Sequence, residues 1–593
     1  MFDFVLSFLG SIFMNRFPVW RFLTCFVVFW GTFHSILIQA HNDPHAPVPS
    51  VRAVKVDQPI HVDGVLDESF WQDCEIATSF IDIRTQQPAA QQTLARIAYT
   101  STHLYVAVEC LDDDIAHLHA SEQREDRDFS GDDFIELHLD PTHCHRSKYA
   151  FFSNPLGTRR DANEGPSGTF NTGWTAEWEL AAKILADRWV FEMSIPLTIM
   201  NYFRENGQTW GLNFTRVLRR TDVTSFWSYN PTDYYKPRYF GHLTGLDLAE
   251  SEFSRNWETT PYLSTRYDFG DSSSATLLQA GVDTSFRLTP SITTAWTVNP
   301  DFGQVEADDD TIELRDTERF LPEKRLFFRE GEELLSMRKQ LYYSRRFTNI
   351  DTGAKISGEW KDYKFSLLNI QGDVTHGEAR YGNSTVFRTL QNIGERSSLG
   401  YYLSDSEFEN GYSRVASMDG NFFLNDDWQY RFQSSLAMDR EEDSGGTVSK
   451  DRFDYLGNSS IVYSKYPWGF DLNYDAISKG FDPVLGYIPR RDIFGPRLHG
   501  NYHHQAENRW YKDVSVDFES VLYENEDDET ILRDYSLYSS VIFPNDFGLE
   551  AGQSIDYHAP YDNTRTNAGV TFFSSDLWKS IGLSWAGGEF ENI

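Results

Sequence analysis

From Thr259 to its end, the chain is a succession of segments in which apolar and polar residues alternate. One such segment carries Trp428, Tyr430, Phe432, Ser434, Leu436 and Met438 on one face and Arg431, Gln433, Ser435 and Asp439 on the other. Successive side chains of a β-strand point to opposite faces. A strand with one apolar and one strongly polar face suits a transmembrane barrel with a wet interior. We therefore predict an antiparallel transmembrane β-barrel over residues 259–593, in the outer membrane of a Gram-negative cell.

The connections between these segments are those of a barrel. About eighteen candidate strands are separated alternately by short turns and by long polar loops. The short turns include Thr289–Ser291, Asn425–Asp427, Lys465–Pro467 and Pro544–Asp546, and the long loops include Arg440–Asp451 and Glu524–Thr530. A soluble β-sandwich or propeller is the alternative, because alternation does not distinguish lipid from a second sheet. Aromatic residues at strand ends favour lipid. The chain stops at Gly587–Ile593 rather than on a strand with a terminal aromatic residue, so a complete barrel and one that lacks closing strands both stay open.

Composition and the N-terminus narrow the class of protein further. A net charge of -35 excludes nucleic acid as a partner, since a nucleic-acid binder needs a basic surface. Residues 1–40 combine Arg16 and Arg21 with a long apolar run, which predicts a signal peptide with a true start at either Met1 or Met14. An uncleaved anchor helix is the alternative. Residues 41–50 are expected to form a linker.

Residues 51–250 differ from the barrel segment. Strand signals occur at Ala95–Tyr99, Leu104–Leu111, Phe134–Leu139, Trp189–Ile195 and Trp210–Leu218. A compact β-sandwich is the simplest architecture for such a block. We therefore expect an all-β chain, with an N-terminal sandwich, a connector at residues 251–258 and the barrel.

The sandwich segment also carries motifs of a known family. Gly131–Pro141, Val62–Trp71, Arg96–Asp113, Trp174–Pro196 and Thr209–Phe214 resemble, in order and spacing, the family 9 carbohydrate-binding module. The resemblance implies a β-sandwich that binds sugars and calcium.

The barrel segment is similar to an uncharacterised barrel domain that often follows such modules. The residues that carry this resemblance are Asn299–Asp308, Phe320–Arg325, Phe327–Gly331 and Tyr343–Arg346. It implies an outer-membrane location and no established activity.

Candidate sugar-binding residues lie near the end of the sandwich segment. Trp174 and Trp178 are four residues apart, which on a strand places both rings on one face. A sugar site needs such aromatic planes with a few fixed polar groups. The polar candidates are Arg96, Arg160, Asn163 and Glu164. Burial of one or both rings in the core is the alternative.

Acidic residues crowd the loops of the same segment. Calcium accepts six to eight oxygen ligands in loose geometry, so closely spaced carboxylates on irregular backbone could bind it. The candidate ligands are Asp112, Asp113, Asp128, Asp132 and Asp133. The alternative is a solvated acidic loop.

The segment from Asp316 to Arg346 is rich in both signs of charge. In a barrel, such charges can pair across the lumen and fix a segment that folds inward. The residues expected in this network are Glu318, Arg319, Glu323, Lys324, Arg325, Arg345 and Arg346. An exposed charged loop is the alternative.

No common catalytic motif is present, and among 88 acidic residues no carboxylate pair stands out. We therefore expect a non-catalytic outer-membrane protein whose sandwich binds a glycan or oligosaccharide, with calcium as the one candidate cofactor and membrane lipid around the barrel. Two alternatives stay open. One is a component of carbohydrate catabolism that hydrolyses O-glycosyl bonds. The other is a structural or assembly barrel with a protein-binding sandwich.

Overall fold

The computed structural model describes most of the chain from residue 48 to residue 590. The segments outside this description are residues 1–47, 58–59, 166–169, 231–234, 252–256, 270–273, 301–317, 322, 324, 330, 395–396, 442–450, 507–508, 559–560, 574–579 and 591–593. The expected signal peptide and most of the expected linker and connector therefore lie outside the described residues.

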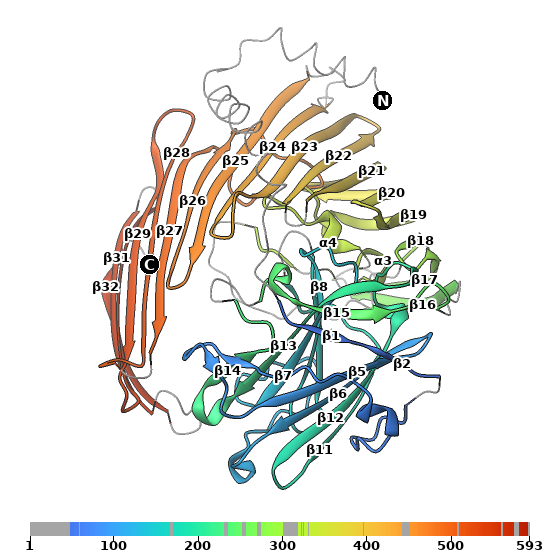
Figure 1. Cartoon of the computed structure of the whole chain (residues 1–593). Coiled ribbons are helices and arrows are strands. Elements are labelled where there is room, and N and C mark those ends of the chain that lie inside the picture. Colours follow the sequence, from blue (N-terminus) through green and yellow to red (C-terminus); the bar gives the residue numbers. More distant parts are fainter. Residues whose placement is uncertain are drawn as a thin grey trace.

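The N-terminal part is a β-sandwich of two sheets (Figure 1). The larger sheet has the order β10 (Phe170–Asn171), β9 (Arg159–Glu164), β8 (Lys148–Ser153), β7 (Phe134–Asp140), β13 (Gln208–Leu218), β14 (Val223–Phe226), β3 (Ile81–Asp82) and β4 (Gln87–Pro88), with β15 (Gly241–Leu246) between β13 and β1 (Ser50–Arg52). The smaller sheet has the order β11 (Glu179–Ile184), β12 (Arg188–Pro196), β6 (His103–Leu111), β5 (Thr93–Tyr99) and β2 (Val54–Lys55). Short 3-10 helices connect some strands, at Ser69–Gln72, Ile115–His117, Leu197–Ile199, Arg219–Thr221 and Pro237–Tyr239.

The core of the sandwich lies between the two sheets. Ile97 and Val106 of the smaller sheet and Leu137, Phe151 and Trp210 of the larger one are at most 1% exposed and belong to one apolar cluster. Central strands buried on both sides read as nearly continuous apolar runs, which is why the sequence locates them. All five predicted strands of this segment are confirmed, each within two residues of its predicted bounds.

The second part is one antiparallel sheet of 17 strands that pair in chain order. Its strands are β16 (Trp257–Phe269), β17 (Ser274–Thr289), β18 (Ile292–Val298), β19 (Phe347–Trp360), β20 (Tyr363–His376), β21 (Glu378–Ile393), β22 (Ser397–Phe408), β23 (Gly411–Phe423), β24 (Trp428–Glu441), β25 (Arg452–Lys465), β26 (Trp468–Ile477), β27 (Ile493–Gln505), β28 (Asp513–Glu524), β29 (Thr530–Ile542), β30 (Phe547–His558), β31 (Tyr561–Phe572) and β32 (Ile581–Phe590). The sheet curves into a barrel wall (Figure 1). Within the described residues, β16 and β32 are not paired with each other. The expected fold class, a sandwich followed by an antiparallel barrel, is confirmed.

The two faces of the barrel wall differ as the alternation predicts. On β20, Lys364, Ser366 and Leu368 are buried on the inner face, whereas Tyr363 and Leu367 are exposed on the outer face. Large apolar side chains are exposed from β16 to β32. Among the described residues, no helix is long and apolar enough to cross a membrane.

A segment between β18 and β19 folds against the inner face of the wall. It contains the short helices α3 (Leu326–Arg329) and α4 (Glu332–Leu335) and the 3-10 helix η6 (Ser344–Arg346). Phe327, Leu335 and Leu341 of this inward segment pack with Leu368 and Tyr402 of the wall in one buried cluster. The Tyr402 hydroxyl donates a hydrogen bond to the Leu341 carbonyl at 2.9 Å. Apolar packing therefore holds part of the segment inside the barrel wall.

Candidate functional site

The sandwich carries a cleft of about 550 Å³ beside the edge of its two sheets. Its walls come from the start of β9, from the irregular segment Thr175–Trp178 and from the ends of β11 and β12. Five acidic side chains line it, Glu125, Asp126, Asp161, Glu177 and Glu179, together with Arg159 and His103. Their number makes the cleft acidic, so it disfavours anionic ligands and favours donors of hydrogen bonds.

Asp161 is the most deeply placed polar group of this cleft. Its side chain is 3% exposed, and its Oδ2 atom accepts hydrogen bonds from Trp178 Nε1 at 2.8 Å and from the Ala176 backbone N–H at 3.3 Å. Within the described part of the chain, its Oδ1 atom has no hydrogen-bond partner. Burial raises the pKa of Asp161 to about 6, although the two donors act against that rise. Asp161 therefore lines the cleft with one oxygen bound to protein donors and a second, buried oxygen that has no partner among the described residues.

Arg159 lies two residues earlier on the same face of β9. Its guanidinium group contacts Glu125 Oε1 at 2.8 Å and lies 5.7 Å from the centre of the Trp178 ring. It also donates a hydrogen bond to the Trp178 carbonyl. These contacts fix a cation beside the Glu125 carboxylate, and such a pair can bind hydroxyl groups through both donors and acceptors.

The two tryptophans predicted to bind sugar are placed differently. The segment that holds them is irregular and leads into β11, which begins at Glu179, so the alternation of a strand does not place the two rings. Both rings nevertheless pack edge-on against Phe151. The distance between ring centres is 6.0 Å for Trp174 and 5.3 Å for Trp178. Trp174 is half-buried and also packs on Tyr149. Trp178 is 3% exposed, so it forms part of the cleft floor and offers no open plane for stacking.

The four polar candidates do not gather around Trp178. Arg96 pairs with Glu109 at 2.7 Å in the smaller sheet. Arg160 pairs with Asp128 at 3.0 Å, and Glu164 pairs with Lys148 at 2.9 Å. Side chains alternate along a strand, so Arg160 and Glu164 face away from Asp161.

Asn163 shares the face of Asp161 but lies by a separate small cavity that also touches the barrel. The predicted residues are therefore the neighbours of the two cleft residues on β9, and Arg159 and Asp161 are not among them. The alternation in Arg159–Glu164 was the available signal, because it places every second polar residue on one face.

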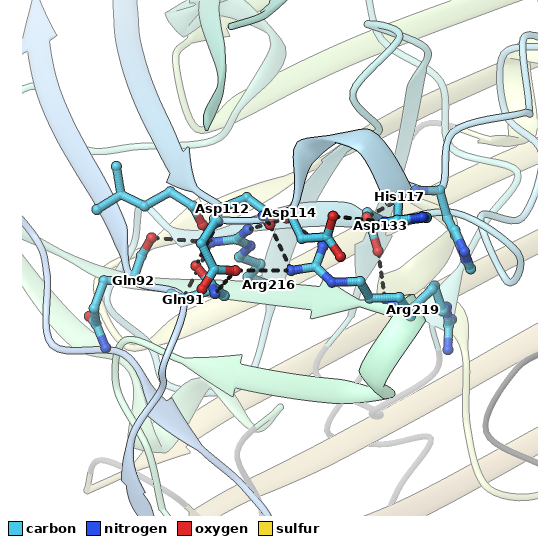
Figure 2. Close-up of polar contacts among 12 residues, drawn as sticks. Gln91, Gln92, Asp112, Asp114, His117, Asp133, Arg216 and Arg219 are labelled. Atoms are coloured by element: carbon cyan, nitrogen blue, oxygen red, sulfur yellow. Dashed lines mark hydrogen bonds and ion pairs between the residues drawn. The ribbon is translucent and has the colours of Figure 1, made fainter. Parts of the chain in front are cut away.

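The acidic loop around Asp112 is neutralised by arginines (Figure 2). Arg220 makes two contacts with the Asp112 carboxylate, at 2.6 and 2.7 Å, and Arg216 lies 3.8 Å from it. Burial favours the protonated form of Asp112, but Arg220 and the Asp114 N–H outweigh it and hold the pKa below its usual value. Asp113 accepts a hydrogen bond from Gln91 at 2.5 Å.

Asp132 and Asp133 also bind donors of the protein. Asp132 is 1% exposed and accepts four hydrogen bonds, from Ser121 N, Ser121 Oγ, Glu122 N and Asn154 Nδ2, at 2.8 to 2.9 Å. Asp133 accepts hydrogen bonds from the backbone N–H groups of His119 and Arg219. In the described part of the chain, no group of three or more acidic, histidine or cysteine residues is arranged to hold a metal ion. The five aspartates as placed do not fit a calcium site, and calcium binding by the chain stays a prediction.

The inward segment contains most of the charged network expected in the lumen. Arg346 pairs with Glu318 at 2.6 Å, and Arg325 pairs with Glu323 at 2.7 Å in a buried contact. These pairs lie within the segment rather than across the lumen. Arg345 is part of η6, Arg319 is exposed, and Lys324 lies outside the described residues.

Two cations that the sequence reasoning missed join the segment to the wall. Arg338 donates hydrogen bonds to Asn458 at 2.8 Å and to Asn473 at 3.0 Å. Lys339 pairs with Asp475 at 2.8 Å, and its backbone N–H binds Gln433. The partners lie at least 94 residues away in the sequence, so no local pattern points to them.

Comparison with known proteins gives a family match for the barrel part. Residues 257–363 match the family described as "Domain of unknown function (DUF5916)". These residues contain β16 to β19, the helices α3, α4 and η6, and the first residue of β20, so the resemblance seen in the barrel segment is confirmed there. No curated protein sequence matches the chain.

Solved structures resemble each part of the chain in fold. A carbohydrate binding module family 9 from Caldicellulosiruptor kristjanssonii in complex with cellotriose is 16% identical and covers 33% of this chain and 93% of its own, with a TM-score of 0.26. A putative carbohydrate-binding protein from Bacteroides uniformis ATCC 8492 is 16% identical and covers 33% and 99%, with a TM-score of 0.29. OccK11 (OpdR) from Pseudomonas aeruginosa is 9% identical and covers 77% and 96%, with a TM-score of 0.28. Similarity at this level assigns no activity to the chain.

Proposed function

We propose that the chain is an outer-membrane protein whose sandwich binds an uncharged or amino-sugar oligosaccharide in the cleft around Asp161. The observation that carries this proposal is the set of fixed polar groups on one cleft wall. Asp161 places a carboxylate in this wall, and Arg159 is held in place by Glu125 and Trp178. Sugar hydroxyl groups both donate and accept hydrogen bonds, and therefore match a wall that offers carboxylates and a guanidinium group.

The membrane location rests on the two faces of the barrel wall. The outer face exposes aromatic and aliphatic side chains such as Trp468, Leu472 and Trp585. An exposed apolar surface of this extent requires a lipid or protein partner. Strands with an apolar outer face and a polar inner face are those of outer-membrane barrels. The barrel would anchor the sandwich or pass its ligand.

A second candidate function is hydrolysis of an O-glycosyl bond. It is favoured by the pKa of Asp161, which burial raises to about 6 in a cleft that holds further carboxylates. A carboxyl group of that kind is suited to act as a general acid. Binding remains the preferred function. Hydrolysis needs a second carboxylate positioned as nucleophile or base opposite Asp161, whereas binding needs only the polar groups of the cleft wall.

Binding to a glycan array by the full chain in detergent tests the proposal. We expect retention of neutral or amino-sugar oligosaccharides and exclusion of uronic-acid and sulfated ones, because the cleft is acidic. The variant Asp161→Ala should lose binding at least tenfold, since it removes the carboxylate from the cleft wall. Asp187→Asn is the control, as Asp187 lies in the turn at the far end of β11 and β12.

Two results would contradict the proposed function. Equal binding by Asp161→Ala and the wild type would move the site away from the cleft. Release of shortened glycan products by the wild type, but not by Asp161→Asn, would favour the hydrolase.

A further inference from the structure

The loop between β7 and β8 of the sandwich contacts the barrel wall through buried charges. Arg146 of this loop is 7% exposed, donates to the Gly394 carbonyl at 3.1 Å and contacts Asn392. From the wall, Lys364 is 2% exposed and donates to Ser147 Oγ at 3.0 Å. Lys364 also pairs with Glu359 of the wall at 2.6 Å, so buried cations from both sides, each with polar partners, meet at this interface.

Further contacts extend the interface along the same edge of the barrel. The Tyr239 hydroxyl donates to the Asp426 carbonyl at 3.4 Å, and the Arg238 guanidinium lies 4.3 Å from the centre of the Phe423 ring. At another point, Arg287 donates a hydrogen bond to the Thr198 carbonyl. The sandwich therefore lies along one rim of the wall, as Figure 1 shows.

All these barrel residues lie at or beside turns of the same rim. The turns that follow β17, β19, β21 and β23 must share one end of an antiparallel sheet, and the turns that follow the even-numbered strands share the other. On the contacted rim the connections have two to eight residues, and the four beside the sandwich contacts are residues 290–291, 361–362, 394–396 and 424–427. The opposite rim also has short turns, such as residues 377 and 409–410, but it carries the three longest connections between strands, residues 299–346, 442–451 and 478–492.

Short turns lie on the periplasmic side of outer-membrane barrels, and long loops lie outside. From the rim that the sandwich contacts, we infer that the sandwich is docked on the periplasmic mouth of the barrel. Its cleft then opens to the periplasm, and its ligand is a glycan of that compartment. This inference rests on the proposed membrane location and gives the side on which the proposed site meets its ligand.

The docked sandwich also meets the inward segment. Arg329 of α3 donates to the Gly173 carbonyl at 2.5 Å. A Cβ atom added to Gly165 would lie 2.5 Å from Glu333 Cβ, which shows how closely the sandwich approaches α4. The sandwich therefore contacts the inward segment as well as the rim of the wall.

Labelling of single introduced cysteines in intact cells tests this orientation on the full chain. Leu185→Cys places a thiol in the exposed turn between β11 and β12 of the sandwich, where Leu185 is 47% exposed. Asp527→Cys places one in the exposed connection between β28 and β29, on the long-loop rim. The native Cys74, Cys110 and Cys144 are buried, so an unmodified chain supplies the background.

With a membrane-impermeant maleimide, we expect Asp527→Cys to react in intact cells and Leu185→Cys to react only after the outer membrane is permeabilised. Labelling of Leu185→Cys but not of Asp527→Cys in intact cells would overturn the orientation and leave the membrane location standing. The same labelling of both variants, before and after permeabilisation, would overturn the orientation together with the proposed membrane location. The labelling pattern does not depend on glycan binding. A cleft that fails to bind sugar on the array would therefore contradict the proposed ligand without changing the labelling result.

Discussion

Replacement of Asp132 by alanine is expected to lower the free energy of unfolding of the sandwich by about 3–5 kcal/mol. The substitution removes a carboxylate that is 1% exposed and leaves four donors without their acceptor. Buried donors that lose an acceptor cost stability because water does not replace it. Calorimetric melting of the full chain in detergent measures the loss.

Asp128→Ala is the matched control, because the Asp128 side chain is 71% exposed and makes one surface ion pair with Arg160. An exposed pair of this kind contributes about 0–1 kcal/mol. Equal melting temperatures for the two variants would contradict the role of Asp132 as a loop anchor. Melting in the presence of a calcium chelator tests the calcium prediction. If the chelator lowers the melting temperature of the wild type as much as Asp132→Ala does, the Asp132 carboxylate binds a metal ion.

The affinity of the cleft for its oligosaccharide is expected to fall roughly tenfold between pH 7 and pH 5, because a hydrogen bond to an ionised acceptor is the stronger one. Burial raises the pKa of Asp161 to about 6, so the carboxylate becomes protonated within this interval. Titration calorimetry of the full chain at several pH values measures the profile. Asp161→Asn should bind more weakly at pH 7 and show a flat profile, whereas Asp187→Asn should keep the profile of the wild type. A tenfold fall that persists in Asp161→Asn would assign the titration to another group.

The same raised pKa has a consequence for the ligand-free protein. The pKa of Asp161 lies above its ordinary value of 3.8. The folded state therefore favours the protonated form of Asp161. The free energy of unfolding gains its full contribution from this group below about pH 4 and loses it as the pH rises through about 6. Asp161→Asn should remove this part of the pH dependence.

The sequence predicts the barrel wall well because each strand has a pattern of its own. On β24, Phe432 is on the apolar outer face and Gln433 and Ser435 are buried on the inner face, as the period of two requires. The central sandwich strands are recognisable for a related reason, since burial on both sides produces apolar runs such as Leu104–Leu111. Both signals are local, and neither depends on which strands become neighbours.

The candidate site depends on contacts that have no local pattern. Asp161 meets Trp178 because the irregular segment before β11 returns to the edge of β9. The density of acidic residues in loops predicts shared ligands, whereas Asp112 and Asp132 bind separate sets of protein donors in the structure. Composition alone gives the number of carboxylates but not the direction in which each one points.

The position of a bound oligosaccharide in an experimental structure of the full chain tests the central claim most directly. The oligosaccharide retained best on the glycan array would be the ligand. We expect a sugar ring in the cleft, with one hydroxyl within hydrogen-bond distance of the Asp161 carboxylate and another near Arg159. A ring stacked on Trp174 or bound within the barrel, with the cleft left empty, would contradict the claim.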